Sequence, residues 1–343
     1  MKKWNKARLS AVSAALCALL WLAPATAALA DTPEELIPLG GTVGIELKMG
    51  GVLVVGLSRV PAGCVGIGPA EAAGLGNGDL ITEIGGMPIA CAADFLSAAT
   101  GFDGSAVTVV AERDGEPVQF TVEPVQNDEG VYQMGLWLRD GISGIGTMTY
   151  YDPASGVYGA LGHGINDLET GELVEPKDGN ITASEVIDVL PGTGGTPGEL
   201  CGRMDKEAYL GSIERNTDSG IFGVLAEAAG GECVPVAGED EIALGPASIL
   251  SNVSGSEIRS YDVEITRLYH DEGDSRCLML RVTDPELLAV TGGIVQGMSG
   301  SPILQNGKLV GAVTHVLVQD PQKGYGISIE RMLKTAESEF LAA

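Results

Sequence analysis

The sequence predicts a mainly β protein of about two domains, given roughly 100–200 residues per domain. The chain has 343 residues, of which 45% are hydrophobic and 19% charged, so it can bury a sizeable core and is not disordered. Glycine is abundant, with 50 residues, whereas aromatic residues make up only 5%. Short runs of valine and isoleucine separated by glycines are typical of strands joined by tight turns.

The strong negative charge narrows the classes of partner. The chain carries 46 acidic and 20 basic residues, a net charge of −26. So few cations cannot neutralise a phosphate backbone, which argues against nucleic acid as a partner. The same charge argues against docking on an anionic bilayer surface.

Residues 1–30 have the order of a secretory signal. Four cations lie within residues 1–10, a largely apolar run covers residues 11–23, and small residues follow up to Ala30. Cleavage after Ala30 leaves 20 − 4 = 16 basic residues against 46 acidic ones, a net charge of −30. An uncleaved signal anchor is the alternative, although the run is short of the roughly 20 apolar residues that a spanning helix needs.

The cysteines and histidines do not predict a disulfide framework or a metal site. Five cysteines follow the signal, without regular spacing or a CxxC pair: Cys64, Cys91, Cys201, Cys233 and Cys277. One or two bridges and buried free thiols both remain open. The chain has three histidines and no HExxH motif, so neither zinc nor any other cofactor is implied.

Residues 36–126 are predicted to form a small α+β domain. The expected elements are a buried strand over 51–55, a helix over 69–74, a strand over 80–84, a helix over 91–99 and a hairpin over 107–122. The dipeptides Gly85-Gly86 and Asp114-Gly115 are expected to form the two hairpin turns.

Two short motifs in this domain resemble PDZ domains of the bacterial type. They are PAEAAGL over residues 69–75 and GDLI over residues 78–81. The resemblance implies a carboxylate-binding loop before the first core strand, and Val43, Gly44 and Ile45 stand in that position. The implied partner is an extended peptide that adds a strand to an open sheet edge. A nucleotide-binding interpretation of the glycines in this region is rejected, because no strand leads directly into them.

Residues 127–343 are predicted to form an all-β barrel or sandwich. Strand-like segments recur over 132–138, 146–151, 157–161, 181–189, 263–268, 278–282, 308–315 and 326–329. A long irregular stretch rich in glycine and acid is expected over 190–243, and one closing amphipathic helix over 330–341.

Two glycine-rich motifs in this half carry chemistry. In GALGHG, residues 159–164, His163 follows a strand; in GMSGSP, residues 297–302, Ser299 lies between glycines. A serine is a weak nucleophile without an adjacent base, and His163 is the histidine in a motif-like turn. The backbone amides of Gly297 and Ser299 are expected to form an oxyanion hole. An ordinary turn at Ser299 and catalysis by Ser301 are the alternatives, while a surface position is the better interpretation of His270.

The GMSGSP motif resembles the nucleophile loop of chymotrypsin-like serine peptidases, which implies a double β-barrel. Residues 309–314 resemble the strand that follows the nucleophile in those enzymes and lines their primary specificity pocket. Thr314 and His315 are therefore expected to border the substrate cleft. A partly buried, hydrogen-bonded structural role for His315 is the alternative.

The chain as a whole resembles the SpoIVB family of sporulation serine peptidases over roughly residues 36–335. The resemblance lies in GVLVVG (51–56), RDG (139–141), GIGT (144–147), YDP (151–153), GALGH (159–163), TDPEL (283–287) and GGIVQGMSGSP (292–302). It implies His163 as base, Asp284 as its orienting acid and Ser299 as nucleophile. The residues alone leave the acid open, because Asp284 before a proline also fits a helix N-cap, and Asp167 is another candidate.

The resemblance also implies a biological role. The protein is expected to be exported into the space between the two forespore membranes and to cleave itself and a membrane-embedded regulator of an intramembrane protease, which activates a late sigma factor. The PDZ domain is expected to bind the protein's own chain or the target. A non-catalytic PDZ adaptor and a general quality-control PDZ protease are the competing hypotheses.

Overall fold

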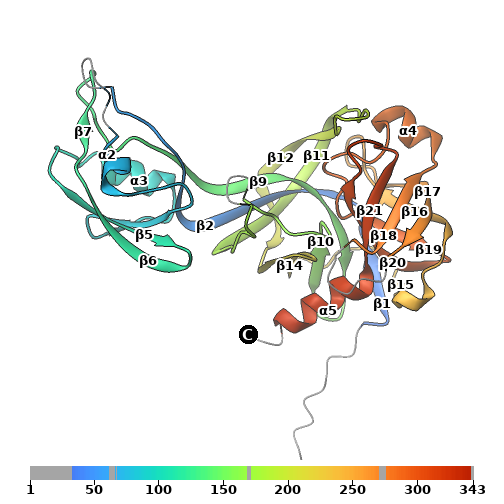
Figure 1. Ribbon diagram of the computed structural model, residues 1–343. Helices are drawn as coiled ribbons and strands as arrows, with labels where there is room; N and C mark the ends of the chain where they lie inside the picture. The colour runs from blue at the N-terminus through green and yellow to red at the C-terminus, as the bar shows by residue number, and fades with distance from the viewer. Residues whose placement is uncertain (1–32, 62–65, 67, 168–170, 270–275, 341–343) are drawn as a thin grey trace, which may run out of the picture. The chain divides into compact units, whose positions relative to one another are not determined.

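The computed structural model describes residues 33–61, 66, 68–167, 171–269 and 276–340 (Figure 1). The predictions for residues 1–30, Cys64 and His270 fall outside these ranges. Strands dominate the described chain, as the composition predicts. No helix within these ranges is both long and apolar enough to cross a membrane.

A small α+β unit forms around its own apolar core. Its elements are the second half of β2 (Thr42–Leu57), α2 (Pro69–Ala73), β3 (Leu80–Ile84), β4 (Met87–Pro88), α3 (Ala92–Ala99), β5 (Val107–Arg113), β6 (Glu116–Val122), β7 (Val125–Gln126) and β8 (Tyr132–Gln133). The buried side chains include Val52, Ile81, Val109, Val122 and Met134. The predicted helices and strands of this region are therefore confirmed, and the core extends beyond residue 126 to include Met134.

Local sequence explains where these elements begin and end. Helix α2 has a proline in its first turn and ends at Gly74, whose φ of 92° is the left-handed conformation of a helix C-cap. The hairpin turn between β5 and β6 has Asp114 and Gly115 at φ 53° and 77°. Positive φ at both central residues matches the right-handed twist of the flanking strands, which is why an Asp-Gly pair predicts the hairpin.

A first barrel-like sheet contains strands from both halves of the sequence. Six strands follow one another in the order β14 (Gly220–Val224), β10 (Val157–Ala160), β9 (Leu136–Tyr151), β2, β11 (Asp178–Leu190) and β12 (Glu199–Ser212). An isolated bridge between Gly211 and Leu225, with Ala226 N 2.9 Å from Leu210 O, brings β12 back to the end of β14. β1 (Glu35–Pro38), β13 (Arg215–Thr217) and β15 (Val234–Pro235) extend the sheet.

Two sequence predictions are corrected by this sheet. Residues 42–48, assigned to the first domain, pair with β9 and β11. The stretch 190–243, expected to be irregular, contains β12, β13, β14 and β15. Its longest strand, β12, is rich in charged and glycine residues and no residue between Cys201 and Leu210 is buried, so it lacks the apolar run that marks a buried strand.

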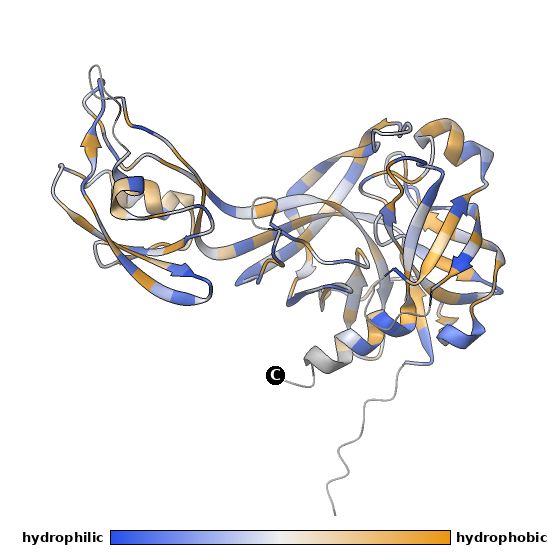
Figure 2. Ribbon diagram, viewed as in Figure 1, coloured by the Kyte–Doolittle hydropathy of each residue, from blue (hydrophilic) through white to orange (hydrophobic). Residues whose placement is uncertain are grey.

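The second barrel is closed and has an apolar interior. Its strands run in the order β16 (Gly245–Ser251), β17 (Arg259–Leu268), β18 (Leu278–Val282), β21 (Lys323–Ser328), β20 (Lys308–Val316) and β19 (Pro302–Gln305). Figure 2 shows the apolar residues along these strands. The buried core includes Ile249, Leu280, Ile303, Val313 and Ile327, and α4 (Pro285–Thr291) lies between β18 and β19 in the chain. The two six-stranded systems confirm the predicted double-barrel fold.

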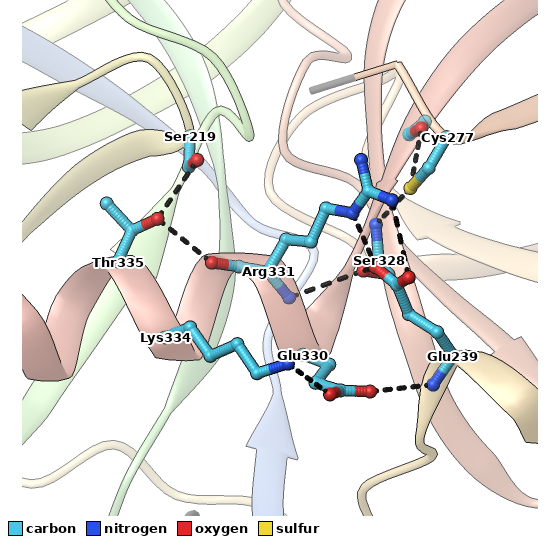
Figure 3. Close-up of polar contacts among 9 residues, drawn as sticks. Ser219, Glu239, Cys277, Ser328, Glu330, Arg331, Lys334 and Thr335 are labelled. Carbon is cyan, nitrogen blue, oxygen red and sulfur yellow. Dashed lines mark hydrogen bonds and ion pairs between the residues drawn. The ribbon is translucent and has the colours of Figure 1, made fainter. Parts of the chain in front are cut away.

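The closing helix α5 (Ile329–Phe340) is held by a network of polar contacts (Figure 3). Arg331 binds Glu239 in the short helix η1 (Glu239–Glu241), with 2.5 Å between Nε and Oε1, and Ser328 Oγ donates to the same carboxylate. Thr335 Oγ1 lies 3.1 Å from Ser219 Oγ, in the turn between β13 and β14. The helix therefore joins the closed barrel to the first sheet.

Candidate active site

A cleft of about 460 Å³ contains the two motifs that the sequence singles out. Its walls come from the turn after β10, the loop before β19 and the strand β20. His163, Gly297, Ser299, Thr314 and His315 all line it. The structure thus brings together the expected nucleophile and base, both expected oxyanion-hole residues (Gly297 and Ser299) and both predicted cleft residues.

His163 is presented by a tight turn at the end of β10. Leu161 and Gly162 adopt φ values of 68° and 71°, and a Cβ at position 162 would lie 3.0 Å from Ile327 and 3.1 Å from Thr314. His163 Nδ1 lies 2.8 Å from Gly164 O. A carbonyl oxygen only accepts, so Nδ1 carries the proton and Nε2 of the neutral ring is left as the basic nitrogen.

The ring of His163 packs against the ring of His315. Their centroids are 4.6 Å apart and the rings are inclined by 37°. Burial lowers the pKa of His163, and the hydrogen bond to the Gly164 carbonyl offsets part of this shift. His163 is therefore kept neutral to a lower pH than an exposed histidine, which suits a general base.

The loop that carries Ser299 is shaped by two glycines. Gly297 and Gly300 have φ values of 95° and 97°, a conformation that side chains disfavour. A Cβ at Gly300 would lie 1.9 Å from the carbonyl oxygen of Thr147, so this position requires glycine on steric grounds as well. Ser299 Oγ donates to the Thr314 carbonyl at 2.6 Å. Within the described residues it makes no hydrogen bond to His163, so the serine rests in a rotamer that is not yet engaged with its base.

The backbone around Ser299 has the features of an oxyanion hole. Among the described residues, the amides of Gly297 and Ser299 donate no hydrogen bond. The carbonyls on the opposite sides of the same two peptide units are occupied: Gln296 O accepts from Leu200 N at 2.9 Å, and Met298 O from Ser301 N at 3.0 Å. In a trans peptide the carbonyl and amide point in opposite directions, so these bonds fix the direction of both free amides.

Two buried threonines of β9, which sequence reasoning did not identify, hold the nucleophile loop. Thr147 Oγ1 donates to Gly297 O at 2.7 Å and Thr147 N to Ser299 O at 2.9 Å, while Thr149 Oγ1 donates to Gly300 O at 2.8 Å. Both threonines are fully buried. Buried hydroxyls need hydrogen-bond partners, and two threonines at alternate positions of a predicted strand lie on the same face. This Thr-x-Thr pattern could have indicated that β9 binds a neighbouring segment.

Asn216 of β13 is a second residue that the sequence did not reveal. Its side-chain oxygen accepts from Ile165 N at 2.9 Å, and its amide nitrogen donates to Ile165 O at 2.7 Å and to Val174 O at 2.8 Å. The buried amide therefore fixes the backbone two residues after His163. A single asparagine in a polar stretch carries no distinctive sequence signal.

The structure places Asp284 at the N-cap of α4. Its Oδ1 accepts from the amides of Glu286 and Leu287, both at 2.9 Å, and Oδ2 lies 3.4 Å from Asp262 N. In the part of the chain that the structure describes, no hydrogen bond joins Asp284 to His163, and Asp284 does not line the cleft. The other candidate acid, Asp167, is buried and paired with Arg139 at 3.0 Å.

The alternative nucleophile and the expected PDZ loop occupy other positions in the structure. Ser301 is fully buried, and its hydroxyl has no partner within the described residues. Val43, Gly44 and Ile45, expected in a PDZ carboxylate loop, pair with β11 on one side of β2 and with β9 on the other. Because both edges of that segment are occupied, it cannot add a peptide strand, and the placement corrects the assignment.

The chain also matches a known peptidase family over most of the residues that form this cleft. The profile of the SpoIVB peptidase S55 family matches residues 130–333, more than half of the chain. The chain belongs to this family. The match spans both His163 and Ser299, and the protein is a serine peptidase. None of the curated proteins matches the chain.

Several solved protease structures are similar at low identity. The Rv3671c protease in its inactive form matches with a TM-score of 0.35 and 12% identity, covering 58% of this chain and 85% of that one. The active form, from M. tuberculosis, gives 0.34 and 14%, covering 55% and 70%. The serine protease AL20 from an extremophilic microorganism gives 0.34 and 14%, covering 57% and 91%.

Replacing Thr147 by valine tests the hydrogen bond from its hydroxyl to the nucleophile loop. The change keeps the shape but leaves Gly297 O without its partner, which costs about 1–3 kcal/mol and lowers kcat/KM by roughly tenfold to a hundredfold. Peptide hydrolysis measures the effect. Thr182→Val is the matched control, because Thr182 is also buried and its hydroxyl has no partner among the described residues. Equal activity of both variants contradicts the assignment.

The lowered pKa of His163 predicts the acid limb of the pH profile. Because the base stays neutral as pH falls through the ordinary histidine value of about 6.5, half-maximal kcat/KM lies below that pH. Initial rates from pH 4.5 to 8, with circular dichroism at each pH to exclude unfolding, measure it. A midpoint above pH 7 with the fold intact would contradict the buried, neutral base.

The cap contacts of Asp284 predict different effects for two substitutions. Asparagine also caps helices, so Asp284→Asn keeps kcat/KM within about threefold, whereas Asp284→Ala loses about 1 kcal/mol of stability. Chemical denaturation and peptide hydrolysis measure the two effects. A loss of activity on the order of 10⁴-fold in a folded Asp284→Asn protein is instead the signature of a triad acid.

Proposed function

We propose that this serine peptidase is an exported endopeptidase of sporulation signalling, which cleaves itself and a membrane-associated regulatory protein. The observation that carries the peptidase chemistry is the pair of free amides at Gly297 and Ser299 beside the Ser299 hydroxyl, within one cleft with His163. Family membership supports the sporulation role. The signal-like order of residues 1–30 supports export.

The proposed reaction is hydrolysis through an acyl-enzyme. Ser299 Oγ leaves the Thr314 carbonyl and attacks the scissile carbonyl carbon, while Nε2 of His163 takes its proton. The amides of Gly297 and Ser299 bind the negative oxygen of the tetrahedral intermediate. His163 returns the proton to the leaving amine, and water then hydrolyses the ester. The Gly164 carbonyl keeps the proton on Nδ1 throughout and so fixes the ring orientation.

We further propose that the small α+β unit is a PDZ domain whose peptide site differs from the predicted one. A groove of about 520 Å³ lies between α3 and residues 131–137, lined by Phe95, Leu96, Phe102, Met134 and Leu136 among others. At its edge, β9 pairs with β2 through Leu136 and Trp137, and Trp137 is 65% exposed. An apolar groove beside a strand fits a peptide with an apolar terminal residue.

Self-cleavage tests the proposed endopeptidase. Purified wild-type protein is expected to cut itself at defined bonds over a mass-spectrometric time course, and Ser299→Ala to stay intact, because removing the nucleophile of a serine peptidase costs about 10⁶-fold in rate. Ser301→Ala is the matched control and retains cleavage. Identical fragments from wild type and Ser299→Ala would exclude Ser299 as nucleophile.

Substitution on α3 tests the proposed peptide groove. Leu96 is 66% exposed and lines the groove, so Leu96→Glu weakens binding at least about tenfold by placing an unpaired charge against the apolar end of the peptide. Fluorescence polarisation with a pool of labelled decapeptides that end in apolar residues measures it. Met87→Glu, exposed on β4 and outside the groove lining, is the control. Equal binding by all three proteins would exclude this groove.

A further inference from the structure

The first sheet forms a wall of the catalytic cleft on the side of His163. The residues of this wall come from β2, β9 and the turn after β10, and all of them are apolar: Ile45, Ile142, Gly144, Ile145, Leu161 and Ile165. Among the residues that the structure describes, no aspartate, glutamate, lysine or arginine lines the cleft. None of the six side chains takes part in the proposed reaction steps.

A recess in this wall lies at Gly144. Gly144 pairs with Ile45 of β2 and lies two residues after Ile142 in β9, so the three residues share one face of the sheet. Gly144 is exposed, and a Cβ built there would meet no atom of the described residues within 4 Å. Isoleucine side chains therefore flank a position on the wall that the protein itself leaves open.

The residues around the Gly144 recess are held in place by the rest of the first sheet. Ile142 and Ile165 pack against the buried cluster that contains Ile45. Ile165 N donates to Asn216 Oδ1 at 2.9 Å, and Ile165 O accepts from Val174 N at 3.0 Å. Because the recess is already shaped, an apolar group that enters it does not have to order these side chains first.

The position of His163 determines which part of a substrate meets this wall. At the attacked peptide bond, the carbonyl oxygen binds the amides of Gly297 and Ser299. The nitrogen of the same bond must lie next to Nε2 of His163, because that atom protonates the leaving amine. His163 follows β10 of the first sheet, and Ile165 is two residues further along the chain. The first residue of the leaving chain therefore faces the wall that contains the Gly144 recess.

Resting on the proposed endopeptidase function, we infer that the Gly144 recess binds the side chain of the residue that follows the cleaved bond, and that this residue is aliphatic. The substrate class is a polypeptide in which a leucine- or valine-like residue becomes the new amino terminus. An aliphatic side chain gains by burial against Ile142 and Ile165, whereas a charged one loses hydration and meets no opposite charge. Gly144 is the specificity-determining residue, because a side chain at that position occupies the recess.

Capture of the acyl-enzyme by added amines measures this site separately from the acyl side of the substrate. A peptidyl thiobenzyl ester acylates Ser299 and releases its thiol. An amino acid amide then attacks the ester carbonyl carbon, Nε2 of His163 takes a proton from the amine, and Ser299 Oγ leaves and receives that proton. Because this attack is the reverse of the departure of the leaving amine, both amines occupy the same place.

The proportion of acyl-enzyme captured by each amide rather than by water is the measured quantity. Leucinamide is expected to capture wild-type acyl-enzyme at least about tenfold more efficiently than lysinamide or the α-amide of glutamic acid. Chromatography of the peptide products measures the three ratios. The thioester used is one that wild-type protein hydrolyses and Ser299→Ala does not.

A charge placed in the recess should change this preference. Gly144→Asp is expected to shift capture toward lysinamide relative to leucinamide at least about tenfold. Gly230→Asp is the matched control and should keep the wild-type ratio. Gly230 is also an exposed glycine without left-handed φ or an atom near its Cβ position, and it lies outside the cleft lining. If Gly144→Asp does not fold, Gly144→Leu is the second variant, and it should lower capture by leucinamide relative to glycinamide.

The outcomes separate failure of the inference from failure of the proposed function. Equal capture by the three amides, preferred capture by a charged amide, or hydrolysis of the thioester without capture by any amide overturns the inference. An unchanged ratio in a folded Gly144→Asp protein also overturns it. If no peptidyl thioester is hydrolysed in a manner that Ser299→Ala abolishes, the proposed endopeptidase function fails instead.

Discussion

Hydrogen bonds from both six-stranded systems fix the backbone of the nucleophile loop, residues 296–301. The positions of Ser299 and of the two amides beside it depend on these bonds. From the first sheet, Thr147 binds the carbonyls of Gly297 and Ser299, and Leu200 N binds the carbonyl of Gln296. From the closed barrel, Gly300 N donates to Val313 O at 2.7 Å. The bond from Leu200 N occupies one side of the Gln296–Gly297 peptide unit, and among the described residues the Gly297 amide on its other side donates no hydrogen bond, whereas Met298 N donates to Val295 O at 3.1 Å.

In the resting protein the loop amides and His163 are already held in place, whereas the Ser299 hydroxyl must still move. The amides of Gly297 and Ser299, which we propose as the oxyanion hole, are oriented before substrate arrives, and this avoids reorganising them during the reaction. His163 is held by its bond to the Gly164 carbonyl and by the turn that contains Gly162. Ser299 is the exception, since its hydroxyl is engaged with the Thr314 carbonyl. The hydroxyl must therefore leave the Thr314 carbonyl before it can react.

The sequence predicts those features of the site that depend on residues close together in the chain, namely turns and helix caps. Glycines around Ser299 and before His163 predict the two turns because their left-handed backbone has few alternatives. The proline after Asp284 predicts the helix cap for the same local reason. Thr147, Asn216 and the pairing of Val43–Ile45 escaped prediction, because their roles depend on strands far apart in the chain. β12 escaped because its charged, exposed residues resemble those of a loop.

The most direct test is a crystal structure of the protein with a peptidyl phosphonate bound covalently to Ser299. The account predicts the phosphonyl oxygen at roughly 2.7–3.1 Å from the amides of Gly297 and Ser299, with Ser299 Oγ released from Thr314 O and the Thr147–Gly297 bond unchanged. A flipped Gln296–Gly297 peptide, or a loop detached from Thr147, would contradict a site whose backbone is set before substrate binds.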